Sequence, residues 1–210
     1  MFAKIKSFIN NYWYYYKWYV LGGLFLLFAL VVVIVQSATV ERYDASVIWA
    51  MKGYVDTPYV QEMEKELEKY CEDVDGNGEV NVRVILVTYT TDGGMPNSEV
   101  EFSMQQRLIT QLSAGDVYIV ITDETAYENH IAKLNAFENL EDEYPDNPNI
   151  DGYKYYLKDT VFTQNEMLSK VIGEDTFMIM GSEDMQKLNL EDEKLYEKMR
   201  EAFDRIVKAG

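Results

Sequence analysis

Residues 45–89 have the sequence ASVIWAMKGYVDTPYVQEMEKELEKYCEDVDGNGEVNVRVILVTY, and this stretch decides the fold of the chain. Its first six residues are mostly apolar and predict a strand. A helix then begins, with Thr57 as its N-cap and Pro58 in its first turn. Residues 80–89 predict a second strand, so the whole stretch is a β-α-β unit. The helix between the strands has an apolar stripe at helical spacing, formed by Tyr59, Met63, Leu67, Tyr70 and Cys71.

The alternation of helix and strand continues to the end of the chain. Residues 98–115 predict a helix that opens with a capping box. Residues 116–121 form a short apolar run, which is typical of a parallel strand covered on both faces. This order predicts an α/β domain, a three-layer and mainly parallel sheet with helices on both faces. The remaining expected elements are a helix over residues 123–137, a helical piece near 164–171, a strand at 176–180 and a closing amphipathic helix at 191–208.

A membrane-length apolar segment lies near the N-terminus. Residues 18–35 contain no charged side chain, and as a helix these 18 residues would span roughly 27 Å, close to a hydrocarbon core of about 30 Å. Tyrosines and tryptophans crowd residues 12–19, as in an interfacial aromatic belt. The alternative is a signal peptide cleaved before Ala38. The length of the apolar run and the aromatic belt favour an uncleaved anchor.

Charge on the two sides of this segment predicts its orientation. Lys4, Lys6 and Lys17 precede it without any acidic residue, so we expect the N-terminus in the cytoplasm. The protein would then lie in the cell membrane as a single-pass chain with an extracytoplasmic C-terminal domain. The expected parts are a cytoplasmic basic and aromatic segment (1–17), a transmembrane helix (18–36), a linker (37–44) and an α/β domain (45–210).

The composition excludes several classes of function. The net charge is -17, and residues 37–210 carry 16 basic and 36 acidic side chains, which excludes the usual nucleic-acid binder. Such a domain would stand off anionic lipid and could attract cations or a basic partner, or its acids could simply keep it soluble. One cysteine, Cys71, excludes an internal disulfide, and one histidine, His130, makes a zinc site or a catalytic triad improbable. We therefore expect no enzyme and no catalytic residue.

Residues 73–79, DVDGNGE, resemble the start of a calcium-binding loop. Oxygen ligands at alternate positions followed by glycine suit one hard cation, with Asp73, Asp75, Asn77 and the carbonyl of Glu79 as ligands. The twelfth position is Val84, where a bidentate glutamate is expected. The alternative is a tight turn between helix and strand.

A second candidate site lies at the ends of the expected strands. In open α/β sheets, ligands bind beyond the carboxyl ends of the strands. Polar loops follow three of these strands and could line a groove, although every such sheet has loops there. The candidate ligand-binding residues are Lys52, Tyr54, Thr91, Asp92 and Asp123.

Two stretches carry a family resemblance. Residues 49–53 before the first helix, and residues 105–123 with QQRLITQLSAGD leading into VYIVITD, resemble extracellular solute-binding proteins. Together with the apolar segment, the chain is similar to membrane-anchored, solute-binding-like proteins of Gram-positive bacteria. The resemblance implies one lobe of a periplasmic-binding-protein fold and the binding of a small solute or peptide. Because one lobe cannot enclose a solute, the alternative is a non-catalytic scaffold subunit that docks on another membrane protein.

Overall fold

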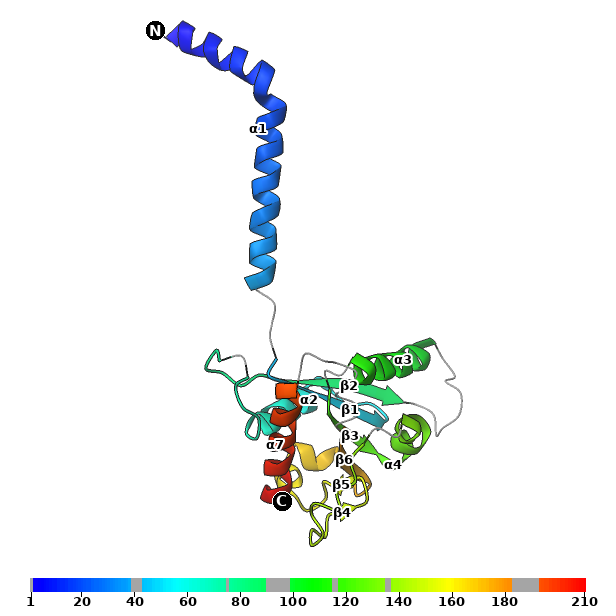
Figure 1. Ribbon diagram of the computed structural model, residues 1–210. Coiled ribbons are helices and arrows are strands. Elements are labelled where there is room, and N and C mark those ends of the chain that lie inside the picture. Colours follow the sequence, from blue (N-terminus) through cyan, green and yellow to red (C-terminus); the bar gives the residue numbers. More distant parts are fainter. Residues whose placement is uncertain are drawn as a thin grey trace. The chain divides into compact units, whose positions relative to one another are not determined.

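The computed structural model describes residues 2–38, 43–74, 76–89, 99–114, 117–134, 137–182 and 193–210. The chain divides into two compact units, Met1–Arg42 and Tyr43–Gly210, which are described separately. The first contains one helix, α1 (Phe2–Ala38) (Figure 1). Within it, Trp13–Ile34 is long and apolar enough to cross a membrane, with a mean hydropathy of 2.3. The apolar span expected from the sequence is therefore present as a continuous helix.

The second unit is built on one six-stranded sheet (Figure 1). Strand β1 pairs in parallel with β2, the edge strand, on one side and with β3 on the other. Strand β6 runs antiparallel to β3 and continues the sheet to the short β5 and β4. In spatial order the strands are β2 (Val82–Tyr89), β1 (Ala45–Lys52), β3 (Ile119–Asp123), β6 (Thr176–Met180), β5 (Lys154–Tyr156) and β4 (Ile150–Asp151).

The expectation of a mainly parallel sheet is wrong for half of these strands. Residues 150–156 form an unexpected hairpin of β4 and β5, which turns at Gly152 with a φ of 58°. Strand β6 lies between β3 and β5 and runs antiparallel to both. The fold is a mixed α/β sheet with a parallel half and an antiparallel half.

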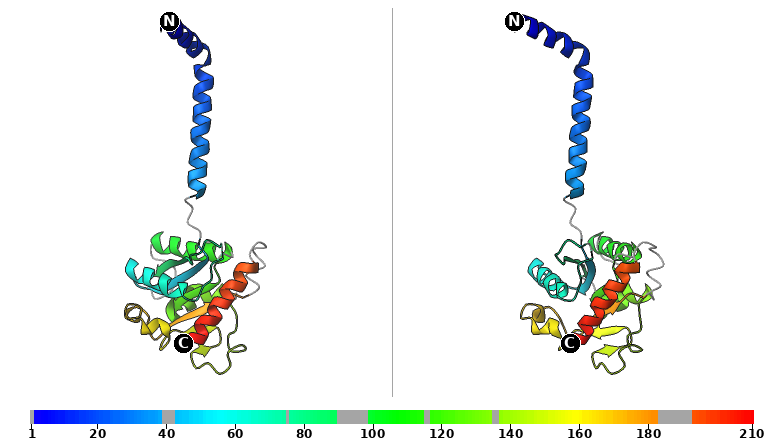
Figure 2. Two further views of the ribbon diagram at one scale, coloured as in Figure 1. Left: turned by 90° about the vertical axis from the view of Figure 1, so that its left-hand side faces the viewer. Right: turned by 60° about the vertical axis from the view of Figure 1, so that its left-hand side comes forward.

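Helices cover both faces of the sheet, as the three-layer prediction requires (Figure 2). Successive residues of a strand point to opposite faces, so Trp49 of β1 joins one core cluster and Ile48 joins the other. The Trp49 face is covered by α2 (Thr57–Glu68), α5 (Val161–Gln164) and α7 (Glu193–Ala209), and the Ile48 face by α3 (Glu99–Ala114) and α4 (Glu124–Ala126).

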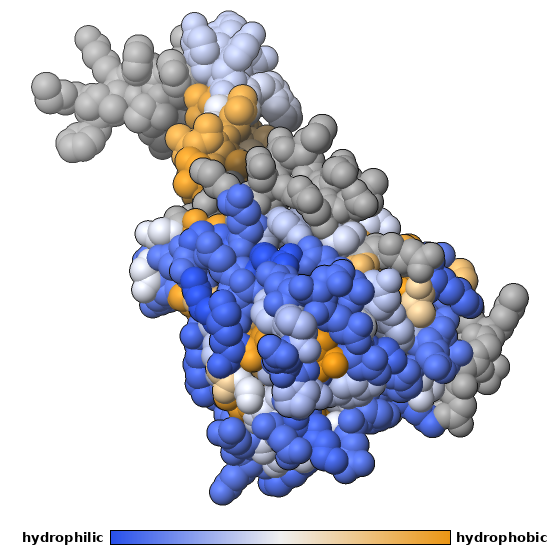
Figure 3. Space-filling view, turned by 60° about the horizontal axis from the view of Figure 1, so that its bottom comes forward, coloured by the Kyte–Doolittle hydropathy of each residue, from blue (hydrophilic) through white to orange (hydrophobic). Residues whose placement is uncertain are grey.

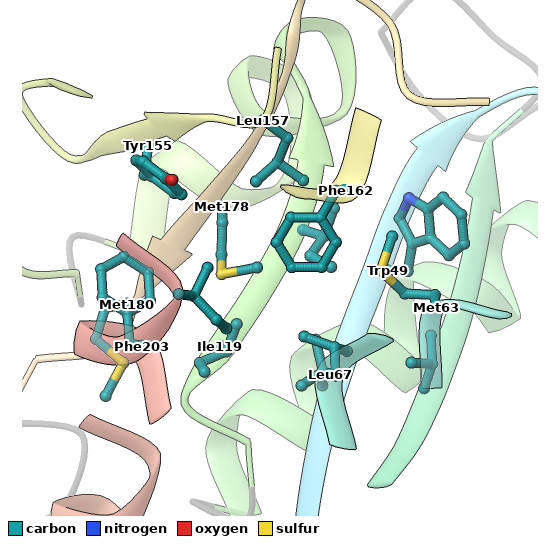
Figure 4. Close-up of a cluster of buried hydrophobic side chains, with 14 of the residues drawn as sticks. Trp49, Met63, Leu67, Ile119, Tyr155, Leu157, Phe162, Met178, Met180 and Phe203 are labelled. Carbon is teal, nitrogen blue, oxygen red and sulfur yellow. The ribbon is translucent and has the colours of Figure 1, made fainter. Parts of the chain in front are cut away.

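The larger core cluster joins all the helices of its face (Figure 4). Met63 and Leu67 of α2, Phe162 of α5 and Phe203 of α7 are buried against the strands, with Met63 near Trp49 and Phe203 near Tyr155 and Met180 at the other side of the cluster. Of the apolar stripe expected for this helix, Tyr59, Met63 and Leu67 lie on α2 and pack in the cluster, whereas Tyr70 and Cys71 pack there from beyond its last residue, Glu68. Cys71 packs against the same cluster, and burial raises the pKa of its thiol to about 12, consistent with the packing role expected for it.

Helix ends differ from the sequence-based expectations in two places. The N-cap of α2 is Asp56 rather than Thr57, which is the first helical residue. The helix expected over residues 123–137 has only one α-helical turn, α4, and continues as a π-helix (Tyr127–Ile131) and a 3-10 turn (Ala132–Leu134). Similarly, the piece expected near 164–171 is α5 followed by a separate 3-10 turn at Leu168–Lys170.

Candidate functional site

The parallel half of the sheet has a topological switch point. The chain leaves β1 for β2 on one side, then crosses back to β3 on the other side. Crossovers in opposite directions leave a crevice outside the carboxyl ends of the two strands that flank the switch, here β1 and β3. The register pairs Ala50 with Thr122, so Lys52 and Asp123 end their strands side by side.

Asp123 joins these two strand ends. Its side chain is buried, with 6% of the residue exposed. One carboxylate oxygen accepts the backbone N–H of Lys52 at 2.5 Å, and the other accepts the N–H of Ala126 at 2.8 Å and so caps α4. The carboxylate therefore fixes the shape of the edge, and each of its oxygens keeps one lone pair for a further donor.

The loop after β1 projects from this edge. Gly53 has a φ of 95°, a conformation that glycine adopts without strain, and its N–H donates to the carbonyl of Tyr89 at 2.8 Å. The turn exposes Tyr54, of which 83% is accessible, next to the exposed Lys52. Three predicted ligand-binding residues, Lys52, Tyr54 and Asp123, thus meet at one edge.

The other two predicted ligand-binding residues, Thr91 and Asp92, lie outside the described residues. They follow Tyr89, the last residue of β2, whose carbonyl accepts the Gly53 N–H. The chain therefore leaves the sheet beside the β1 loop just before these two residues.

An ion pair that the sequence analysis missed extends the same edge. The Nζ of Lys154 on β5 lies 2.5 Å from a carboxylate oxygen of Glu124, the residue after Asp123. The same Nζ lies 5.3 Å from the centre of the Tyr127 ring and 5.1 Å from that of Phe177. Burial lowers the pKa of Lys154, but the hydrogen bond and charge of Glu124 outweigh it and raise the pKa overall. The aromatic sequence around Lys154 was the available signal for β5.

A small pocket adjoins this ion pair. It has a volume of about 180 Å³ and is lined by Tyr127, Ala132, Phe137 and Tyr153. Next to it, the π-helix places the ring of His130 parallel to that of Tyr89, with ring centroids 3.9 Å apart. Burial raises the pKa of Tyr89. The sole histidine is thus packed against an aromatic core residue, as expected for a structural imidazole.

The acidic turn after α2 is held by its own backbone. The two carboxylate oxygens of Asp73 accept the N–H groups of Gly76 at 2.6 Å and Gly78 at 2.7 Å. Asn77 accepts the N–H of Glu79 at 2.7 Å. Such side-chain to backbone bonds are typical of a tight turn between a helix and a strand, the alternative to a calcium loop.

The calcium hypothesis itself stays a prediction. Asp75 lies outside the described residues. Among the residues that the structure describes, no group of three or more His, Cys, Asp or Glu side chains is arranged to hold a metal ion.

No protein-family model, curated protein or solved structure matches this chain. The function has to be inferred from the chemistry of the sequence and of these sites.

Proposed function

We propose that the chain is a single-pass membrane protein whose C-terminal domain, outside the cytoplasm, binds a small solute at the carboxyl ends of β1 and β3. The observation that carries the proposal is the switch point between these strands, where the Lys52 N–H bonds to Asp123. The resemblance of residues 49–53 and 105–123 to solute-binding proteins supports the same edge as the ligand site.

Membrane anchoring is supported by the apolar window Trp13–Ile34 of α1. Lys4 and Lys6 precede this window and Lys17 lies near its start, whereas no acidic residue occurs before Glu41. This bias supports a cytoplasmic N-terminus. The domain would then meet solutes that have not crossed the membrane.

The size and polarity of the edge favour a solute over a peptide. The adjoining pocket of about 180 Å³ is smaller than the sites of about 300–1,000 Å³ that hold drug-sized ligands. Tyr54 offers an exposed ring for stacking, and Lys52 offers a cation. On the face of the domain in Figure 3, hydrophilic residues predominate and apolar areas are small. That face therefore lacks the large exposed apolar patch that an extensive apolar contact with a partner protein would need.

Thermal unfolding of the full chain in lipid nanodiscs tests the proposal. A panel of amino acids, polyamines and short peptides would be added one at a time. A ligand that binds the folded chain raises its free energy of unfolding by mass action, by about 2.7 kcal/mol at a ligand concentration of 100 times Kd, and so raises the melting temperature. We expect Lys52→Ala and Tyr54→Ala to abolish the shift. Lys170→Ala, a substitution of an exposed lysine in the Leu168–Lys170 turn, should leave it intact. If no solute stabilises the chain but it co-purifies with one membrane protein, the scaffold alternative replaces this proposal.

A further inference from the structure

A second pocket lies away from the switch point. It has a volume of about 320 Å³ and is lined by Glu66, Lys69, Tyr70, Val161, Gln164 and Asn165. Helix α2 begins just after the carboxyl end of β1 and ends before the start of β2, so residues 66–70 lie toward the amino ends of these strands. The pocket is therefore separate from the site of the proposed function and does not depend on it.

The polar wall of this pocket is held in place from both sides. The side chain of Glu66 is 6% exposed, and the Nζ of Lys69 lies 2.7 Å from its Oε2. The Nδ2 of Asn165 donates to Glu62 at 2.9 Å and approaches the Glu66 Oε2 at 3.5 Å. The Oδ1 of Asn165 accepts the N–H groups of Met167 and Leu168. These bonds fix the amide orientation and link the wall contributed by α2 to that contributed by residues 161–165.

Three polar groups of the pocket keep hydrogen-bonding capacity. Both bonds to the Glu66 carboxylate use Oε2, and Oε1 accepts none within the described residues. The hydroxyl of Tyr70 and the side-chain amide of Gln164 likewise bond to no described residue. Burial, with the charge of Glu66, raises the pKa of Tyr70, so its hydroxyl remains a donor. A ligand could therefore bond to the carboxylate of Glu66, the phenol of Tyr70 and the amide of Gln164. The ammonium group of Lys69 beside them has further N–H donors.

The charges of the pocket select among ligand classes. Glu66 and Lys69 neutralise each other at 2.7 Å, so the pair gives no net attraction to a small ion. The acidic chain, with a net charge of -17, repels anions, and an organic cation at Oε1 of Glu66 would be repelled by Lys69, whose Nζ lies 2.7 Å from Oε2. A neutral ligand with several hydroxyl groups fits better, because each hydroxyl is both a donor and an acceptor.

We propose that this pocket binds a neutral polyhydroxylated ligand, a saccharide unit. Its hydroxyls would donate to Glu66 and accept from Lys69, Gln164 and the hydroxyl of Tyr70. The volume lies at the lower end of the range for ligand pockets, which suits a short saccharide rather than a long chain.

The test is calorimetric titration of the full chain in nanodiscs with neutral mono- and disaccharides, with zwitterionic amino acids and polyamines titrated separately. At least one saccharide should bind, and Gln164→Ala and Tyr70→Phe should each weaken its binding about tenfold. Gln164 is exposed and Tyr70→Phe keeps the ring, so both variants should fold, which their melting temperatures check.

Gln61→Ala is the matched control, because Gln61 is exposed on α2 and does not line the pocket. It should bind the saccharide as the wild type does. Lys52→Ala should also bind normally, which separates this site from that of the proposed function. The inference is overturned if no saccharide binds, if Gln164→Ala and Tyr70→Phe bind it unchanged, or if only zwitterions or polyamines bind in a manner sensitive to these substitutions.

Discussion

Replacing Asp123 by asparagine should separate its two roles at the strand ends. Asparagine has one side-chain oxygen where aspartate has two, and it is as good an N-cap as aspartate. Its oxygen can keep the bond to Ala126, while its NH2 group then faces the N–H of Lys52. The bond lost is one from a partly buried N–H to a charged acceptor, for which about 1.5–3 kcal/mol is expected.

Urea unfolding of the full chain in detergent micelles measures this loss. Trp49 is fully buried, and the other two tryptophans, Trp13 and Trp18, belong to α1, so the change in fluorescence on unfolding reports mainly on the domain. A loss of about 2 kcal/mol corresponds to a melting temperature lower by about 4–8 °C in a domain of this size. Asp123→Ala should cost about 1 kcal/mol more, because it also removes the cap of α4.

The exposed turn residue Asp142 supplies the control, and Asp142→Asn should change the stability by less than about 0.5 kcal/mol. An Asp123→Asn variant as stable as the wild type would show that the bond to Lys52 contributes nothing to stability. If Asp123→Asn and Asp123→Ala were equally destabilised, asparagine would not keep the N-cap bond to Ala126 as expected. The contribution of that bond could then not be separated from that of the bond to Lys52.

Three further effects should be measurable on the same chain. With its thiol pKa raised to about 12, Cys71 should react with iodoacetamide at pH 8 at least ~100-fold more slowly in the folded chain than in urea, and an equal rate would show that the thiol is accessible. Phe203→Ala should cost about 3–5 kcal/mol, because the ring is fully buried, whereas Phe102→Ala on the exposed face of α3 should cost far less in the same urea titration. Hydrogen bonds from two cations of α7, Lys198 and Arg205, lower the pKa of Glu72 below its ordinary value of 4.5. These bonds therefore stabilise the folded state fully above pH 4.5, and the stabilisation is lost as the pH falls through the lower pKa of the folded chain. Glu72→Gln should therefore flatten the acid limb of the stability curve, and an unchanged limb would mean that other carboxylates produce it.

The elements that the sequence predicted well are those whose pattern is long enough to have a period. Helix α7 is an example, since Met199, Phe203 and Ile206 recur at helical spacing and are all buried. Strands β4 and β5 have two and three residues, which is too short for alternation to be recognised. Their position depends on pairing with β6, a tertiary effect that no local pattern contains.

The same division applies to the candidate site. Lys52 and Asp123 could be placed at one edge from sequence, because carboxyl ends of parallel strands lie together. The bond between them joins residues 71 positions apart, and only the register of β1 with β3 brings it about. The pair of Lys154 with Glu124 could not be foreseen, because it requires the antiparallel return through β6 and β5.

Helix α2 connects the two proposed sites, yet we expect them to bind independently. It begins after the Lys52 edge and ends at Glu68, and Glu66 in its last turn lines the second pocket. Coupling would need a second arrangement of α2, but Met63 and Leu67 are almost wholly buried against the sheet, and close-packed side chains resist sliding. Asp123→Asn should therefore leave the affinity of the second pocket for its saccharide unchanged. A change above about fivefold, or 1 kcal/mol, would show that α2 transmits the perturbation and that its packing has an alternative.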